Sequence, residues 1–229
     1  MDFVLWEELK KLTLSDWLWL GATVLLLAGL VAVLILTARK AEKSERANGI
    51  KRADLYALVC GGLCVALSFV LSYIKLFSMP EGGSITLASM LPLLWYAHRF
   101  GLRAGLLAGL AYGVLQFIQN PEFYAPLQVL LDYPLAFACI GLAGLFLRRE
   151  DKGAGRNLVF LLAGVLTGSI ARAACHIVSG AVFFAEYAPA GMNVWLYSLG
   201  YNGGYLGADT VICLVLTVPL WLVTAKRRA

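Results

Sequence analysis

Apolar runs about as long as a membrane-spanning helix follow one another through this chain and limit its possible folds. A helix needs about 20 apolar residues to cross the hydrocarbon core of a bilayer. The chain has 229 residues, of which 60% are hydrophobic and 14% charged, whereas soluble domains average about 25% charged residues. We therefore predict an all-α integral membrane protein. Its predicted spans are residues 17–38, 54–77, 85–98, 102–118, 123–147, 157–184 and 205–225.

The segments between these runs have turn or surface composition. Residues 1–16 place apolar side chains at helical spacing and predict a short amphipathic helix at the membrane interface, with no cleavable signal peptide. Residues 39–53 are a polar, basic linker, which separates an N-terminal segment, 1–53, from a membrane domain, 54–229. Residues 78–84 form a loop rich in Gly and Pro, and residues 185–204 a long loop rich in Tyr, Asn and Gly. The run 85–98 is short for a crossing, so we expect it to be tilted, kinked at Pro92 or re-entrant.

Basic residues are distributed unevenly between the two predicted sides of the membrane. With seven crossings, one side holds 15 of the 19 Lys and Arg residues, in segments 39–52, 99–103, 148–156 and 226–228. Positive charge is enriched in cytoplasmic loops. We therefore expect the C-terminus to be cytoplasmic, and the N-terminus and the loops 78–84 and 185–204 to be outside.

Asp132 lies in the middle of the apolar run 123–147. An ionisable residue inside a membrane span costs roughly 2.5–3.5 kcal/mol on insertion scales, and it usually faces a cavity with a functional role. The topology places Asp132 and His176 at the depth of the outer loop, where aromatic faces and polar side chains are available for a small cationic ligand. The candidate binding residues are Asp132, Tyr133, His176, Tyr197 and Asn202, with aromatic faces from Phe184, Trp195, Tyr201 or Tyr205. Two structural alternatives stay open: Asp132 pairs with Arg172, or the aromatics form an interfacial belt.

Small residues recur every fourth position in two of the runs. Ala53, Ala57 and Gly61 form one such strip, and the run 102–118 carries another at Gly105, Gly109 and Gly113. Strips of this kind allow helices to approach closely. The first strip either packs inside the chain or docks a partner membrane protein.

Signals for enzymatic chemistry are weak. The chain has no phosphate-binding loop and no HExxH or GxSxG motif, and its five cysteines form no CxxC pair. We therefore expect no catalytic residues, no metal site and no cofactor.

Four stretches together resemble the substrate-binding S-component of the energy-coupling-factor (ECF) thiamine transporters. They are Gly82-Gly-Ser-Ile-Thr-Leu-Ala-Ser-Met-Leu-Pro92, Gly105-Leu-Leu-Ala-Gly-Leu-Ala-Tyr-Gly113, residues 128–137 and residues 176–202. The resemblance implies a six-helix core over about residues 54–225, with an extra N-terminal helix outside it. It also implies an outer thiamine site sealed by the loop after the first core helix. It places the site on Asp132, Tyr133, His176, Gly180, Phe184, Tyr197 and Asn202, to which the aromatic composition of the outer loop adds Trp195.

The resemblance also implies partners, and it has three departures. Members associate with a transmembrane T-component and two ATP-binding subunits, and the strip at Ala53, Ala57 and Gly61 is the expected docking surface. Asp132 stands where some members have Glu, and Phe184 stands where Trp is expected. The loop after the first core helix has no Trp, so Phe77 and Tyr73 are the candidates to replace it. Alternatives are binding of another vitamin or a thiamine precursor, and a proton-coupled carrier that uses Asp132 and His176.

Overall fold

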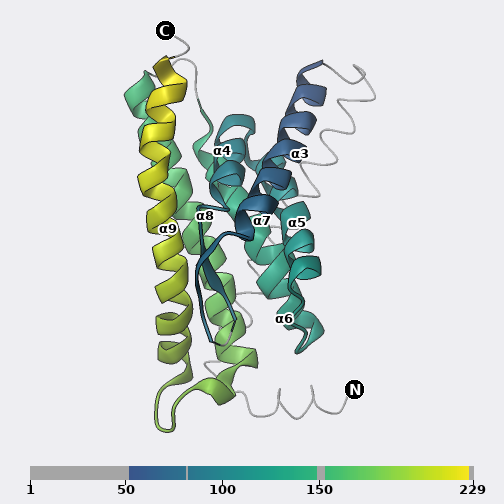
Figure 1. Ribbon diagram of the computed structural model, residues 1–229, viewed down its shortest axis with the longest axis vertical. Helices are drawn as coiled ribbons and strands as arrows, with labels where there is room; N and C mark the ends of the chain where they lie inside the picture. The colour runs from purple at the N-terminus through teal and green to yellow at the C-terminus, as the bar shows by residue number, and fades with distance from the viewer. Residues whose placement is uncertain (1–51, 81, 149–152, 227–229) are drawn as a thin grey trace.

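The computed structural model describes residues 52–80, 82–148 and 153–226 and shows a bundle of helices (Figure 1). The predicted N-terminal amphipathic helix, the span 17–38 and almost all of the linker 39–53 lie outside the described residues. The longer helices are α3 (Arg52–Ser72), α5 (Leu102–Gln119), α8 (Ala154–Phe183) and α9 (Val194–Lys226). Shorter elements are α4 (Leu91–Phe100), α6 (Pro126–Leu130), α7 (Ala136–Ile140), a π-helical turn Leu131–Leu135 and 3₁₀ turns Gly141–Phe146 and Ala185–Tyr187.

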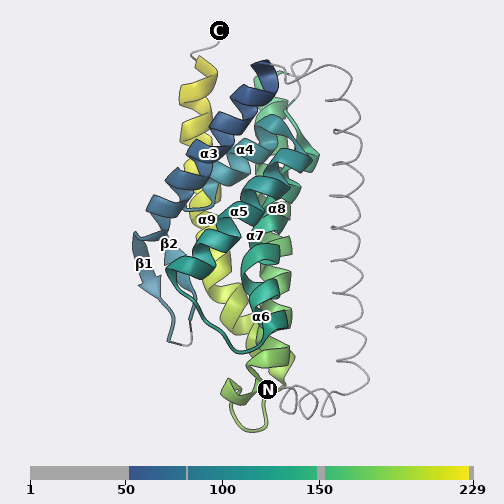
Figure 2. The same cartoon turned by 90° about the vertical axis from the view of Figure 1, so that its right-hand side faces the viewer.

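Five segments within the described residues are long and apolar enough to cross a membrane. They are Asp54–Ser72, Leu102–Gln119, Pro126–Phe146, Ala154–Phe183 and Val194–Thr224. The C-terminus and the start of α3 lie at one end of the bundle, and the connection between α8 and α9 lies at the other (Figures 1 and 2). The protein is therefore mostly helical with several candidate membrane spans.

The third predicted span, 85–98, begins in a β-strand and continues after a turn as the short helix α4. Helix α4 has only ten residues, and Pro92 lies in its first turn, where proline is tolerated because its missing N–H has no helical partner. Pro92 therefore begins the helix and does not kink it. Before α4, strands β1 (Lys75–Ser78) and β2 (Ser84–Thr86) pair antiparallel. The predictions that 54–77 is one helix and 78–84 a simple loop were wrong, since α3 ends at Ser72.

Helix α9 begins at Val194, so the prediction of a long outer loop over residues 185–204 was also wrong. Asn193 starts the helix: its Oδ1 accepts hydrogen bonds from the backbone N–H groups of Trp195, at 2.9 Å, and Leu196, at 3.2 Å. Such a side chain satisfies donors that have no partner inside the helix. The first turns of α9 are poor in aliphatic residues because part of their surface faces a polar cavity and not lipid.

The strip of small residues on α3 packs inside the chain. Gly61 is buried, and a Cβ there would come within 2.8 Å of the Tyr96 hydroxyl oxygen. That hydroxyl donates a 3.0 Å hydrogen bond to the Ala57 carbonyl. Ala57 and Gly61 therefore take part in the contact between α3 and α4, and the docking role of the strip stays a prediction. The exposed face of α3 carries larger apolar residues such as Leu58, which is 72% exposed.

Glycines on α5 bring a broken helix close to it. A Cβ on Gly109 or Gly113 would overlap the carbonyl oxygens of Phe137 and Tyr133, respectively. The facing segment, Pro126–Phe146, changes from α to π geometry at Leu131–Leu135, with Pro134 inside this turn. Proline removes a helical donor, and single π turns often mark functional sites. This turn carries Asp132.

Candidate functional site

A cavity of about 410 Å³ lies between the helices and the β1–β2 hairpin. Its size is within the usual range for small-molecule sites. Its walls come from the π turn, α5, α8 and α9, together with the loop before α6 and the β1–β2 hairpin. Two basic and three acidic side chains line it: Lys75, Arg172, Glu122, Asp132 and Asp209. The described lining is therefore negative by one charge when His176 is neutral.

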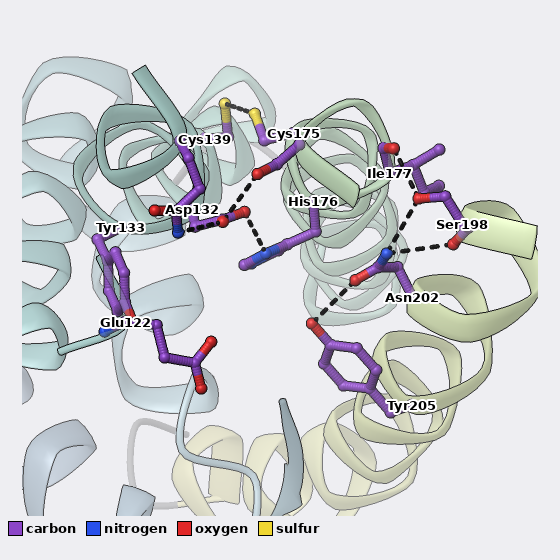
Figure 3. A network of polar contacts seen from close by, with 12 residues as sticks. Glu122, Asp132, Tyr133, Cys139, Cys175, His176, Ile177, Ser198, Asn202 and Tyr205 are labelled. Carbon is purple, nitrogen blue, oxygen red and sulfur yellow. Dashed lines mark hydrogen bonds and ion pairs between the residues drawn. The ribbon is translucent and has the colours of Figure 1, made fainter. Parts of the chain in front are cut away.

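Asp132 sits in the cavity wall with three side-chain donors around its carboxylate (Figure 3). Its Oδ2 accepts hydrogen bonds of 2.8 Å from Gln128 Nε2 and 2.8 Å from Ser179 Oγ. Its Oδ1 lies 3.1 Å from His176 Nδ1. Gln128 and Ser179 are neutral, and among the described residues no Lys or Arg pairs with this carboxylate. The described partners of the Asp132 carboxylate are therefore two neutral hydrogen-bond donors and the His176 ring.

Gln128 and Ser179 are the fixed parts of this arrangement. Gln128 is 1% exposed, and its Oε1 accepts a 3.1 Å hydrogen bond from the backbone N–H of Tyr124. Ser179 is fully buried. Gln128 precedes Asp132 by one helical turn, so helix geometry alone brings the two side chains together. The carboxylate is therefore held in place before any ligand arrives.

His176 presents one free ring nitrogen. Because Asp132 needs a donor at Nδ1, the neutral ring carries its proton there and Nε2 becomes an acceptor. Nε2 is buried and has no hydrogen-bond partner among the described residues. The ring lines the cavity, and its centroid lies 6.5 Å from that of Tyr205. The site thus offers an unused acceptor near the Tyr205 ring, suited to a ligand N–H or O–H group.

One face of α9 supplies the opposite wall. Tyr197, Tyr201 and Tyr205 follow one another at helical spacing, with ring centroids 6.0 and 6.2 Å apart. Asn202 donates to Ser198 Oγ at 3.2 Å and accepts from the Tyr205 hydroxyl at 3.3 Å. The combination of tyrosine faces with one oriented amide suits a flat, polar ring.

Gly180 allows α8 and α9 to meet at this wall. A Cβ at this position would overlap Ser198 Oγ and come within 2.8 Å of Asn202 Nδ2. Ser198 in turn donates a 2.7 Å hydrogen bond to the Ile177 carbonyl on α8. Glycine therefore sets the position of Asn202, and a larger residue would have to displace it.

The β1–β2 hairpin lies along the side of the cavity between α9 and the loop before α6 (Figures 1 and 2). Gly82 and Gly83 both have positive φ, at +85° and +84°, which favours glycine. The Gly82 carbonyl accepts a 2.9 Å hydrogen bond from the Tyr201 hydroxyl. A Cβ on Gly83 would press into the ring of Tyr205. The hairpin tip therefore rests directly on the aromatic face of α9.

A second charged group stands deeper in the cavity. Arg172 Nη1 lies 3.6 Å from Asp209 Oδ2, and both side chains are almost fully buried. The Asp209 carboxylate also accepts from the Thr86 backbone N–H, at 3.1 Å, and from the Thr86 hydroxyl, at 3.0 Å. The Arg172 guanidinium lies 4.6 Å from the ring centroid of Phe137. Arg172 is thus paired with Asp209, so the alternative of an Asp132–Arg172 ion pair is wrong.

The structure gathers most of the predicted site residues at this cavity. The lining includes Asp132, Tyr133, His176, Gly180, Phe184, Tyr197 and Asn202. Trp195 does not line it and instead packs against the buried cluster around Leu135 and Val178. The substitutes considered for the missing tryptophan, Tyr73 and Phe77, are exposed and also lie outside the lining. At the rim, Phe184 packs with Tyr124 and Tyr187, at centroid distances of 5.6 and 6.2 Å.

Sequence reasoning missed four polar residues of this site. Asp209 carried the same signal as Asp132, a carboxylate in an apolar run, and could have been found from it. Glu122 was assigned only to a turn, although it lines the cavity. Gln128 could have been found from its spacing of four residues before Asp132. Ser179 has no distinctive sequence signal as a partner of Asp132, since its role depends on the contact between the π turn and α8.

Comparisons with known proteins agree on one family. Residues 58–228 match the family described as "Thiamine transporter protein (Thia_YuaJ)". A protein named thiamine transporter ThiT from Bacillus subtilis is 42% identical over 156 residues, which is 66% of this chain and 80% of the relative. A protein of the same name from Lacticaseibacillus paracasei is 36% identical over 151 residues, covering 60% and 75% of the two chains.

A solved structure shows the same likeness in three dimensions. The structure of ThiT from Listeria monocytogenes superposes with a TM-score of 0.69 and 26% identity, covering 76% of this chain and 98% of the other. The relatives are named as transport proteins and not as enzymes. With most of its length matched by the family, this chain belongs to the thiamine transporter protein family.

Proposed function

We propose that this chain is the thiamine-binding S-component of an ECF-type vitamin importer, embedded in the cell membrane with its cavity facing outward. The observation that carries the proposal is the Asp132 carboxylate, held in the cavity wall by neutral donors and without a Lys or Arg partner among the described residues. Thiamine joins a thiazolium cation to an aminopyrimidine. A negative cavity lined by aromatic faces and oriented polar groups suits both halves.

The hydrogen-bonding groups divide naturally between the two rings of thiamine. An amino group on the pyrimidine can donate to Asp132 Oδ1 or to the free Nε2 of His176. Asn202 offers its amide to the other ring nitrogens, and Tyr197 adds an aromatic face. Tyr133 supports the site from behind, since its hydroxyl donates 2.8 Å to the Asn120 carbonyl and accepts from the Glu122 N–H.

Competition with thiamine fragments tests the substrate assignment. Purified protein in detergent is titrated with thiamine by calorimetry, alone and in the presence of the hydroxymethylpyrimidine half. We expect saturable binding of one thiamine per chain and weak competition by the fragment, because the fragment lacks the cation. Equal affinity for the fragment would favour a precursor as the natural ligand. An absence of heat with thiamine, confirmed by equilibrium dialysis, would overturn the proposal.

The 3.1 Å contact between Asp132 and His176 also favours a second candidate, a proton-coupled carrier. Paired carboxylate and imidazole groups inside a membrane are used as proton relays. Uptake experiments separate the two functions. The S-component requires its T-component and both ATP-binding subunits, so thiamine uptake should depend on co-expression and ATP. Uptake into proteoliposomes by the isolated chain, driven by a pH gradient, would support the carrier instead.

A further inference from the structure

Besides Asp132 and Asp209, a third carboxylate lines the same cavity. Glu122 follows the turn Asn120–Pro121 between α5 and α6. Its backbone N–H donates a 3.0 Å hydrogen bond to the Tyr133 hydroxyl, which itself donates to the Asn120 carbonyl at 2.8 Å. These two bonds hold the turn against the π turn. Glu122 is therefore on a fixed part of the loop.

The Glu122 side chain is directed into the site. In Figure 3 its carboxylate lies in the space that His176 and Tyr205 also face. The carboxylate packs against the hairpin tip, where a Cβ on Gly82 would come within 2.8 Å of both of its oxygens. It thus occupies the junction between the hairpin, the α5–α6 loop and the cavity.

The two carboxylates differ in how they are bonded. Asp132 accepts from Gln128 and Ser179 and contacts His176. Among the described residues, no hydrogen bond or ion pair reaches the carboxylate of Glu122. Hydrogen bonds already made to the protein fix the direction of Asp132, whereas the Glu122 charge is free to respond to a ligand. A carboxylate without bonded partners suits recognition of charge, which needs no direction.

Electrostatics at Glu122 agree with this reading. Glu122 is an exposed residue, but it also lines the cavity. Its partial burial raises the pKa of Glu122 above the usual range, and the negative charge of Asp132 raises it further, while Lys75 opposes both effects. The charge of Asp132 therefore disfavours the charged form of Glu122 when the space between them holds no cation. A cation between them would stabilise both.

We propose that Glu122 is the residue that recognises the fixed positive charge of the substrate, while Asp132 with His176 recognises its hydrogen-bonding edge. This inference rests on the proposed thiamine function. The sequence predicted that Asp132 alone binds the cationic ligand, whereas here charge recognition and hydrogen bonding belong to two different carboxylates. The inference also assigns the hairpin tip a role, because Gly82 leaves room for the Glu122 carboxylate beside the hairpin.

Binding of a neutral isostere tests the division. Deazathiamine replaces the charged ring nitrogen with carbon and keeps the pyrimidine. Dissociation constants for thiamine and deazathiamine are measured by calorimetry for the parent protein and for Glu122→Gln. We expect Glu122→Gln to weaken thiamine binding by about tenfold or more and to leave deazathiamine binding within about twofold. Glu186→Gln is the matched control, because Glu186 is an exposed glutamate like Glu122 but lies outside the cavity lining.

The possible outcomes are distinguishable. If Glu122→Gln weakens both ligands equally, Glu122 has a structural role and the inference fails. If it weakens neither, Glu122 takes no part in recognition and the inference fails. If the parent protein binds neither ligand, the proposed thiamine function itself fails, whatever the variant does.

Discussion

Asp132 and Asp209 are both carboxylates inside apolar helices, yet their surroundings differ. Asp209 is 2% exposed and pairs with Arg172, and it also holds the hairpin through two hydrogen bonds from Thr86. Asp132 receives hydrogen bonds from neutral side chains and borders the cavity. The comparison suggests how a structural carboxylate in a membrane span can be distinguished from a ligand-binding one. A membrane carboxylate with a fixed cation serves the fold, and one supported only by dipoles is available to a cationic ligand.

The largest loss of stability is expected when Arg172 is removed from its pair with Asp209. Arg172→Met leaves a buried carboxylate without its partner, which typically costs about 3–5 kcal/mol. We expect a large fall in the midpoint of thermal unfolding in detergent. The double variant Arg172→Met/Asp209→Leu removes both charges and should recover much of that loss. If the double variant is as unstable as the single one, the pair is not what stabilises this region.

Giving Asp132 a fixed cation should make it resemble Asp209. Gln128 donates to Asp132 at 2.8 Å from one helical turn away, so Gln128→Lys places an ammonium group there. We expect thiamine affinity to fall by roughly 100-fold, because the ammonium group would occupy the carboxylate that the pyrimidine amino group needs as its acceptor. Gln128→Met removes the hydrogen bond without adding charge and is the control, with a smaller expected loss. Calorimetric titration measures both, and equal losses would contradict a role for charge compensation.

A smaller effect is expected from pH through Glu122. Its pKa is raised, so protons neutralise it at a pH above about 4.3, where an ordinary glutamate is still ionised. Affinity for thiamine should therefore fall as the pH is lowered through that raised pKa. The ionisable groups around it are Lys75, Asp132, Tyr133 and Tyr205. Protonation of the pyrimidine is common to thiamine and deazathiamine, so the ratio of their affinities isolates Glu122. In Glu122→Gln this ratio should lose most of its pH dependence.

The smallest effect is expected at Trp195. This residue was a predicted site residue, but its ring packs against the buried cluster around Leu135 and not in the cavity. Trp195→Phe should change the dissociation constant for thiamine by less than about twofold. Phe184→Ala, which removes an aromatic ring from the cavity rim, is the contrasting variant and should weaken binding measurably. A large loss of thiamine affinity in Trp195→Phe would show that Trp195 contributes to the binding site.

The hydropathy pattern correctly predicted the spans that consist of one uninterrupted helix. The expected runs 102–118 and 157–184 correspond to α5, Leu102–Gln119, and α8, Ala154–Phe183. The ends of these two helices could be predicted because each is a continuous apolar run flanked by polar or turn-forming residues. Helix α9 was predicted too short, because its first turns carry Tyr197, Tyr201 and Asn202 toward the cavity and so resemble a polar loop.

Other features depend on contacts between distant residues and had no local signal. The hairpin consists of strands of four and three residues, too short to show alternation. The partner of Arg172 could not be chosen from sequence, since both Asp132 and Asp209 lie in apolar runs. The strip at Ala57 and Gly61 was correctly read as a close-contact surface, but only the structure shows Tyr96 filling it. The predicted domain boundary and the orientation of the termini stay predictions.

The most direct test of the central claim is a calorimetric titration of Asp132→Asn with thiamine beside the parent protein. The substitution keeps the shape of the side chain and removes its charge. The account predicts thiamine affinity lower by roughly 10- to 150-fold, as expected for a hydrogen bond to a charged group, at an unchanged midpoint of thermal unfolding. Equal affinity in the two proteins would mean that thiamine binds elsewhere or that Asp132 serves only the fold.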